Sequence, residues 1–232
     1  MTTILQRSVL FLLASFVACG LFCPGSFAAE LTLKAVEKEP PKELDASIRA
    51  ALQSKAIQLL DGEKPALEFW LRSEIPLEAK PASIDKGLDG LKQAALLGVV
   101  SVAKATRDYR DDTVPSGHYT MRFASQPQDG NHLGTAEFLY FAVLTPAKLD
   151  TRLDGITDYK TLVKASSKET STDHPMVISL RPATSEEGDF PKLNEPAPEH
   201  KSIRLKIPAK ASGSDQKTSL AFELVYQGVA KK

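Results

Sequence analysis

Short apolar segments, separated by frequent prolines and glycines, constrain the fold of this chain more than any other feature. The 232 residues include 15 prolines and 13 glycines, spread along its length. Residues 66–72 and 220–226 alternate between apolar and polar side chains, as strands with one buried face do. Frequent prolines and glycines favour many short strands over long helices. We therefore predict an all-β fold, a mostly antiparallel β-sandwich of about nine strands with one or two short helices.

Two parts of the predicted sheet can be placed from local pattern. Asp61-Gly62 separates apolar-rich runs at residues 55–60 and 66–72, and this spacing predicts a β-hairpin. Residues 94–105 form the longest apolar run outside the N-terminal segment and are rich in β-branched residues. They predict a buried central strand with a bulge at Gly98.

Helical spacing occurs in two places. Residues 43–54 predict a short helix capped near Asp45, and residues 157–170 predict another with Thr157 or Asp158 as the N-cap. In contrast, residues 182–199 are rich in Pro, Glu and Asp and predict a long surface loop.

Trp70 shares one face of its predicted strand with the charged residues Glu68 and Arg72. We expect a neighbouring segment to cover half of the ring and to supply a partner for the indole N–H. The alternative is an exposed platform for a ligand ring.

The N-terminal segment has the layout of a secretory signal peptide. Arg7 precedes an almost unbroken apolar run at residues 8–22, and small residues at Ser26 and Ala28 fit cleavage before Ala29. We predict that residues 1–28 are a signal peptide and that residues 29–232 form a single domain, exported to the periplasm or the exterior. A buried N-terminal helix or a membrane anchor is the alternative for this segment.

Both cysteines, Cys19 and Cys23, lie inside the predicted signal peptide. Its removal would leave a mature chain without cysteine, so no disulfide is expected and the core must stabilise the fold unaided. Alternatively, Val17-Ala18-Cys19 resembles a lipoprotein processing site that would leave a lipidated Cys19.

The charge balance argues against two classes of partner. The chain has 29 Lys and Arg against 29 Asp and Glu. It therefore lacks the basic excess of a nucleic-acid-binding protein and has no polybasic patch for a membrane surface. The predicted mature chain also has no membrane span.

The polar side chains of most interest gather in residues 114–135. An alternating strand at residues 118–124 is followed by a loop of turn formers and then by a second apolar run. Asp129 and His132 are the candidate metal ligands, although two ligands alone are too few for a site. Turn formation by Asp129-Gly130 and Asn131, with His132 bonded to the loop backbone, is the competing interpretation.

A binding role needs less than a metal site does. On the alternating strand His118, Thr120 and Arg122 share one face, opposite a face that resembles core. The candidate ligand-binding wall consists of four polar residues suited to a sugar or a carboxylate: Arg122, Gln126, Asp129 and His132.

A resemblance to a family extends along the chain, and its most specific part lies in residues 117–135. Gly117-x-Tyr119-Thr120-x-Arg122, followed by Gln126-Pro127-x-Asp129-Gly130-x-His132-x-Gly134-Thr135, is similar to a segment of an uncharacterised family of exported bacterial β-sandwich-like proteins. The resemblance covers most of the predicted mature chain. It implies export and a single domain, and it implies no activity, cofactor or catalytic residue.

The chain contains no G-x-S-x-G element and no glycine-rich phosphate loop, so the pattern favours a protein that is not an enzyme and needs no cofactor. The leading hypothesis is a non-catalytic exported module that binds a polar small molecule or an envelope protein through the 126–135 loop. The alternatives are a secreted metal-assisted enzyme that uses Asp129 and His132, and a purely structural envelope protein.

Overall fold

The computed structural model describes residues 31–126, 139–170, 172–185, 187–214 and 216–228. This part of the chain consists mainly of strands with a few short helices, so the all-β prediction is confirmed. The predicted signal peptide and both cysteines lie outside the described residues. The strands are β1 (Leu31–Glu37), β2 (Leu52–Asp61), β3 (Lys64–Arg72), β4 (Ile75–Leu77), β5 (Leu96–Val102), β6 (Thr106–Arg107), β7 (Thr113–Val114), β8 (Gly117–Ser125), β9 (Tyr140–Pro146), β10 (Met176–Pro182), β11 (Lys192–Ala197), β12 (His200–Ala211) and β13 (Lys217–Gln227). The helices are α1 (Ala46–Ala50) and α2 (Tyr159–Ser166), with 3-10 turns η1 (Ile84–Gly90), η2 (Ala147–Leu149) and η3 (Ser167–Glu169).

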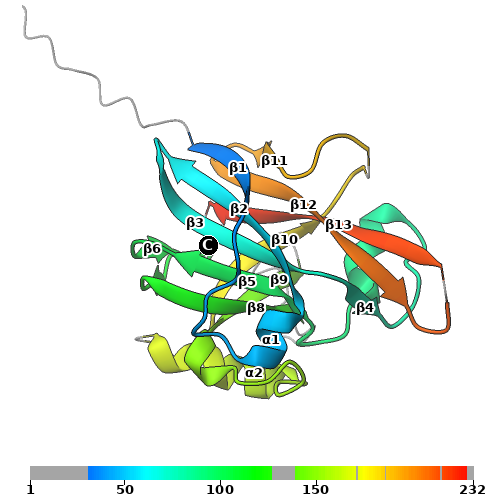
Figure 1. Ribbon diagram of the computed structural model, residues 1–232, viewed down its shortest axis with the longest axis horizontal. Helices are drawn as coiled ribbons and strands as arrows, with labels where there is room; N and C mark the ends of the chain where they lie inside the picture. The colour runs from blue at the N-terminus through cyan, green and yellow to red at the C-terminus, as the bar shows by residue number, and fades with distance from the viewer. Residues whose placement is uncertain (1–30, 127–138, 171, 186, 215, 229–232) are drawn as a thin grey trace, which may run out of the picture.

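Eleven strands form one continuous sheet. Its order is β1-β2-β3-β5-β8-β9-β10-β13-β12-β11, with β4 parallel to β12 and every pair along the main path antiparallel. The sheet curls so strongly that its two end strands, β1 and β11, approach each other (Figure 1). Opposite parts of one hydrogen-bonded sheet therefore enclose the core, whereas the expected sandwich would need two separate sheets. β6 and β7 pair with each other as a small second sheet.

The concave side of the curled sheet holds the main core. Apolar side chains from β2, β3, β5, β8, β9, β10, β12 and β13 form one buried cluster there. Phe69, Phe222 and Met121 are among its largest fully buried members. Burial of apolar surface stabilises such a core by about 25 cal/mol per Å² removed from water. No disulfide joins any two of the described residues, so this cluster is the main source of stability.

The predicted hairpin is confirmed. β2 and β3 pair antiparallel, with Asp61 opposite Lys64, and Gly62 in the turn has φ of 61°. A left-handed backbone conformation of this kind is strained for most residues but open to glycine. The Asp-Gly signal therefore identified this turn correctly.

The predicted bulge at Gly98 is also confirmed, and it changes which face each side chain occupies. The β5–β8 register shifts between Leu96 and Gly98. As a result, Leu97 and Val100 both belong to the main core, while Leu96 and Val99 both belong to a second cluster on the convex side. Simple alternation would not place these four residues in this way, because one extra residue inverts the faces beyond it.

Helix α1 covers Trp70 on the convex side of the sheet. Asp45 caps the helix by accepting a hydrogen bond from the Ser47 amide at 2.8 Å, as expected. Ile48 packs with Trp70 in the second cluster. The Trp70 indole N–H donates to the Lys38 carbonyl at 2.8 Å, and the ring is only 1% exposed. Trp70 is thus more deeply buried than the sequence predicted, and it offers no ligand platform.

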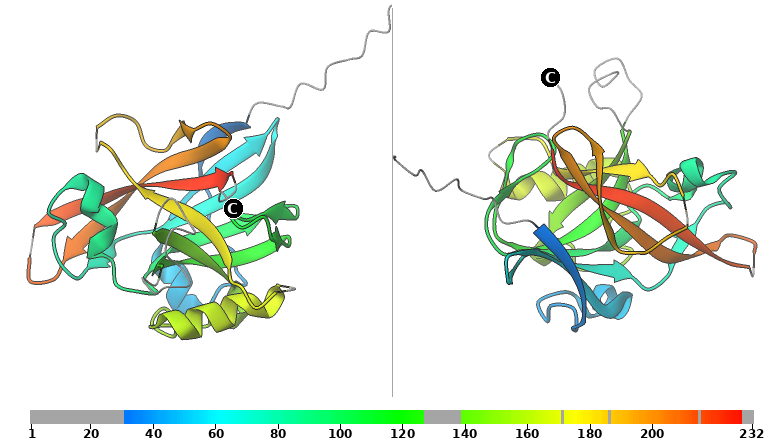
Figure 2. Two further views of the ribbon diagram at one scale, coloured as in Figure 1. Left: turned by 180° about the vertical axis from the view of Figure 1, so that it is seen from behind. Right: turned by 90° about the horizontal axis from the view of Figure 1, so that it is seen from above.

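Helix α2 covers another part of the convex side (Figure 2). Asp158 caps α2 by accepting a hydrogen bond from the Thr161 amide at 2.9 Å. Leu162, a residue of the helix, is fully buried. The predicted helix at residues 157–170 is therefore confirmed in a shorter form. Among the described residues, neither helix has the length and apolar character needed to cross a membrane.

One prediction about the fold was wrong. Residues 182–199 are not a continuous loop, because β11 pairs antiparallel with β12 along part of this range. Asn194 also donates to the buried carboxylate of Glu223 at 3.0 Å. The partner strand supplies the order that the local composition of residues 192–197 does not indicate.

Candidate functional site

Arg122, one residue of the predicted ligand-binding wall, is buried inside the fold. It is 1% exposed, and its guanidinium forms a bidentate ion pair with Asp150. Nε lies 2.6 Å from Oδ2, and an Nη lies 2.9 Å from Oδ1. The remaining donors reach the carbonyl oxygens of Ala94, Arg152, Leu153 and Ile156 at 2.9–3.4 Å. Such planar, multiply bonded pairing suits a structural arginine.

The neighbouring residue on the same face supports the ion pair. Thr120 is fully buried and donates to the Asp150 carboxylate at 2.6 Å. The face that alternation marked as polar is therefore an interior surface, closed by the chain around Asp150. This corrects the expectation that Arg122 meets a ligand: its hydrogen-bonding capacity is already used within the protein.

The other residues of the predicted wall lie at or beyond the end of β8. Gln126 is partly buried, and its backbone N–H donates to the Leu139 carbonyl at 2.7 Å. Asp129 and His132, the candidate metal ligands, lie outside the described residues. Within the described ranges, no cluster of three or more His, Cys, Asp or Glu side chains is arranged to hold a metal ion.

A large hollow lies beside the β2–β3 hairpin, and we call it the hairpin groove. It has a volume of about 410 Å³. Its walls come from the start of β1, the β2–β3 hairpin, the connection from β5 to β6 and the end of β13. The lining residues are Leu31, Leu59, Asp61, Lys64, Pro65, Ala66, Leu67, Ala103, Lys104, Ala105, Thr106, Tyr226 and Gln227.

The hairpin groove combines an apolar surface with a few charges. Leu31, Leu67 and Tyr226 are partly buried and pack against the main core. Burial, together with the nearby charge of Glu195, raises the pKa of Tyr226, so its phenol stays neutral. Lys64 and Lys104 are exposed and form no ion pair with any described residue. A ligand with an apolar body and a polar end matches this lining.

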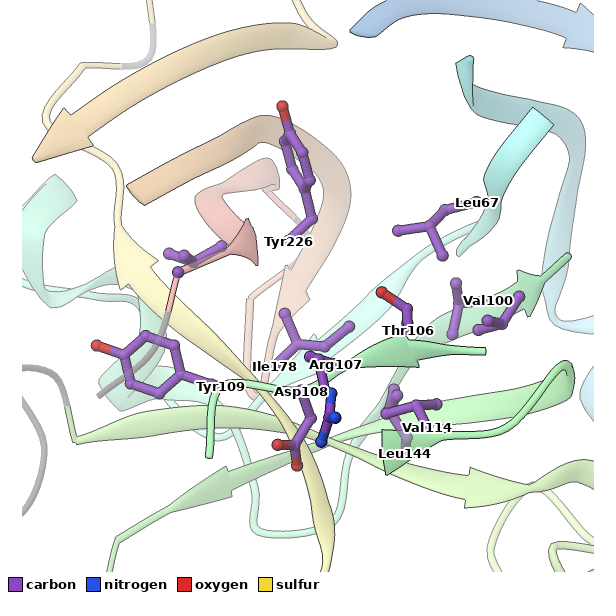
Figure 3. A pocket seen from close by; sticks show the side chains of 13 residues that line it. Leu67, Val100, Thr106, Arg107, Asp108, Tyr109, Val114, Leu144, Ile178 and Tyr226 are labelled. Atoms are coloured by element: carbon purple, nitrogen blue, oxygen red, sulfur yellow. The ribbon is translucent and has the colours of Figure 1, made fainter. Parts of the chain in front are cut away.

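A smaller inner pocket lies next to the hairpin groove. Leu67, Thr106 and Tyr226 line both hollows. Figure 3 shows the apolar side chains of Val100, Leu144 and Ile178 around the inner pocket. Its volume of about 20 Å³ holds roughly one water-sized group.

Asp108 lies at the wall of the inner pocket and holds its surroundings together. The residue is 4% exposed. One carboxylate oxygen accepts from the amides of Arg110 and Asp112 at 2.8 and 2.9 Å, and the other accepts from Val177 at 3.0 Å. Burial raises the pKa of Asp108, while these three hydrogen bonds act in the opposite direction. Asp108 thus ties the 108–112 turn to β10.

We expect Asp108→Asn to be destabilising, with a loss that depends on pH. An amide cannot accept all three hydrogen bonds, which costs about 1–3 kcal/mol. Because the folded-state pKa of Asp108 is raised, the wild type binds more protons folded than unfolded. Its stability therefore falls as pH rises from the unfolded value of 3.8 through the folded pKa. The stability gap between wild type and variant should narrow over this range in urea titrations, and a widening gap would contradict the raised pKa.

No family model, curated protein or solved structure matches this chain. The resemblance to an exported bacterial family therefore stays a prediction.

Sequence reasoning missed the hairpin groove because its walls lie far apart in the chain. Leu31 and Tyr226 come from opposite ends of the described residues, and only the curl of the sheet brings them to one hollow. A partial signal existed in residues 64–67 and 103–106, where lysines interrupt apolar runs at strand ends. The predicted 126–135 loop begins at the opposite end of β8 from Gly117, which pairs with Val102 near the inner pocket.

Proposed function

We propose that this chain is an exported, non-catalytic binding protein that holds a small ligand with an apolar body in the hairpin groove. The observation that carries the proposal is the groove itself, because about 410 Å³ lies within the range of small-molecule sites. Export rests on the signal-peptide layout of residues 1–28 and on the family resemblance. The proposal moves the ligand site from the 126–135 loop to the hairpin groove.

The lining of the hairpin groove favours binding over covalent chemistry. None of the described residues that line it is a histidine, cysteine or serine, the side chains that most often act as a base or a nucleophile. Asp61 is its single carboxylate and lies at the hairpin turn. This set can orient a ligand through charge and hydrogen bonds while its apolar residues remove the ligand body from water.

The binding proposal is tested with N-phenyl-1-naphthylamine, an uncharged dye whose fluorescence rises in apolar surroundings. The purified mature protein should bind the dye saturably. Ala105→Trp places a large ring in the groove at an exposed position and should weaken dye binding at least tenfold, which corresponds to about 1.4 kcal/mol. Ala35→Trp is the matched control, because Ala35 is exposed on β1 and does not line the groove.

Two results would count against this function. Absence of saturable dye binding, or equal binding by Ala105→Trp and wild type, would favour the purely structural alternative. Stoichiometric zinc, copper or iron in the purified protein, lost on His132→Ala, would favour the metal-assisted enzyme that uses Asp129 and His132.

A further inference from the structure

We infer that the ligand of the hairpin groove is a single-chain amphiphile with an anionic headgroup, held at the rim by Lys64 and Lys104. This inference rests on the proposed function and specifies the chemistry of its ligand. It combines the position of the two lysines, the apolar floor between the strand ends and the small size of the inner pocket.

The two lysines lie on neighbouring segments. β3 pairs antiparallel with β5, with Leu67 opposite Val102. The pairing extends one residue further, since the Ala103 amide donates to the Ala66 carbonyl at 3.1 Å. Continuing this register brings Lys104 beside the segment that begins with Lys64. Lys104 then stands opposite Pro65, the residue that follows Lys64, and both lysines are among the residues that line the hairpin groove.

The charges at the rim favour an anion. Lys64 and Lys104 have no ion-pair partner among the described residues, whereas exposed lysines elsewhere, such as Lys55 and Lys148, pair with glutamates. Among the described residues that line the groove, Lys64 and Lys104 carry positive charge and Asp61 alone is acidic, while Glu195 acts on Tyr226 from nearby. A carboxylate or phosphate headgroup would supply the missing counter-charge, and an ammonium headgroup would meet repulsion.

The floor of the hairpin groove suits one hydrocarbon chain. Leu31, Leu67 and Pro65 are partly buried and offer apolar surface along the groove. The neighbouring inner pocket has room for about one water-sized group, so the groove itself must hold the hydrocarbon body. We therefore infer that one hydrocarbon chain lies along this apolar surface.

Four ligands with the same ten-carbon chain test the headgroup: decanoate, decyl phosphate, decanol and decyltrimethylammonium. Each is titrated against the mature protein loaded with N-phenyl-1-naphthylamine. We expect both anions to displace the dye at concentrations at least tenfold lower than decanol, and the ammonium to be the weakest. The ratio of the two anions then tells whether a carboxylate or a phosphate is preferred. Octanoate should bind roughly tenfold more weakly than decanoate, since each buried methylene contributes about 0.8 kcal/mol.

Two variants test the role of the lysines. Lys64→Ser together with Lys104→Ser should weaken decanoate binding roughly twentyfold, because exposed ion pairs contribute up to about fivefold each. Decanol and dye binding should change less than twofold, which shows that the double variant is folded. Lys217→Ser is the matched control, because Lys217 begins β13 at the end far from Tyr226 and is similarly exposed.

The outcomes separate this inference from the proposed function. Equal affinity for decanoate and decanol, or tightest binding of the ammonium, would overturn the anionic headgroup and leave the groove as an apolar binding site. An unchanged preference for anions in the double variant would also overturn it. Failure of the dye to bind would instead remove the proposed function, and the inference with it.

Discussion

Replacing Arg122 with methionine is expected to lower the free energy of unfolding by about 3–5 kcal/mol, because it leaves a buried charge without its partner. Asp150 is 1% exposed and would keep only the hydrogen bond from Thr120 among its present side-chain partners. The carbonyl oxygens of Ala94, Arg152, Leu153 and Ile156 would lose their donors as well. Urea unfolding followed by the emission of the single tryptophan, Trp70, measures the loss.

A double-mutant cycle separates the ion pair from the loss of packing. Arg122→Met combined with Asp150→Leu should be less destabilising than the sum of the two single changes, by about 2–3 kcal/mol. The exposed pair of Lys148 and Glu169, at 2.8 Å, is the control. Lys148→Met should cost less than about 1 kcal/mol. A loss below that value for Arg122→Met would mean that Asp150 is not held in a closed interior.

Gly98→Ala is expected to cost about 3 kcal/mol, at the upper end of the usual penalty for overpacking. A methyl group there would lie 2.4 Å from the Trp70 carbonyl oxygen and 3.1 Å from the Leu71 Cα. Both contacts are backbone atoms of a paired strand, so neither can move aside without disturbing the β3–β5 ladder. The measurement is again urea unfolding.

Gly62→Ala separates this steric effect from the general preference for glycine. Gly62 has positive φ, and a Cβ there would meet nothing within 4 Å. Its replacement should therefore cost only about 1 kcal/mol, which is the conformational term alone. Equal losses for the two variants would show that close approach of the strands is not what requires glycine at residue 98.

The parts of the fold that the sequence predicted correctly depend on local chemistry. The Asp61-Gly62 turn and the caps at Asp45 and Asp158 each involve groups a few residues apart. β11 was missed because its order comes from pairing with β12, and nothing in the proline- and acid-rich composition of residues 182–199 indicates that partner. The very short strands β4, β6 and β7 were also missed, because two or three residues are too few to show the alternation of apolar and polar side chains.

The candidate site was harder to predict than the fold. Arg122 was assigned to a ligand because a charged residue on an alternating strand usually faces water. Its partner Asp150 lies 28 residues further along the chain, so the pattern around Arg122 could not reveal it. The hairpin groove depends on the curvature of a whole sheet, and no single segment of its lining has a distinctive motif.

Because Leu31 begins β1 and Gln227 ends β13, the first and last strands in chain order both border the hairpin groove. A bound ligand would therefore contact both the start of β1 and the end of β13, and it would oppose the fraying of these two strand ends. Resistance to exopeptidases should then increase with ligand concentration. An affinity tag joined directly to either strand would compete for the same space, so protein for binding measurements is best prepared with the tag removed or carried on a surface loop.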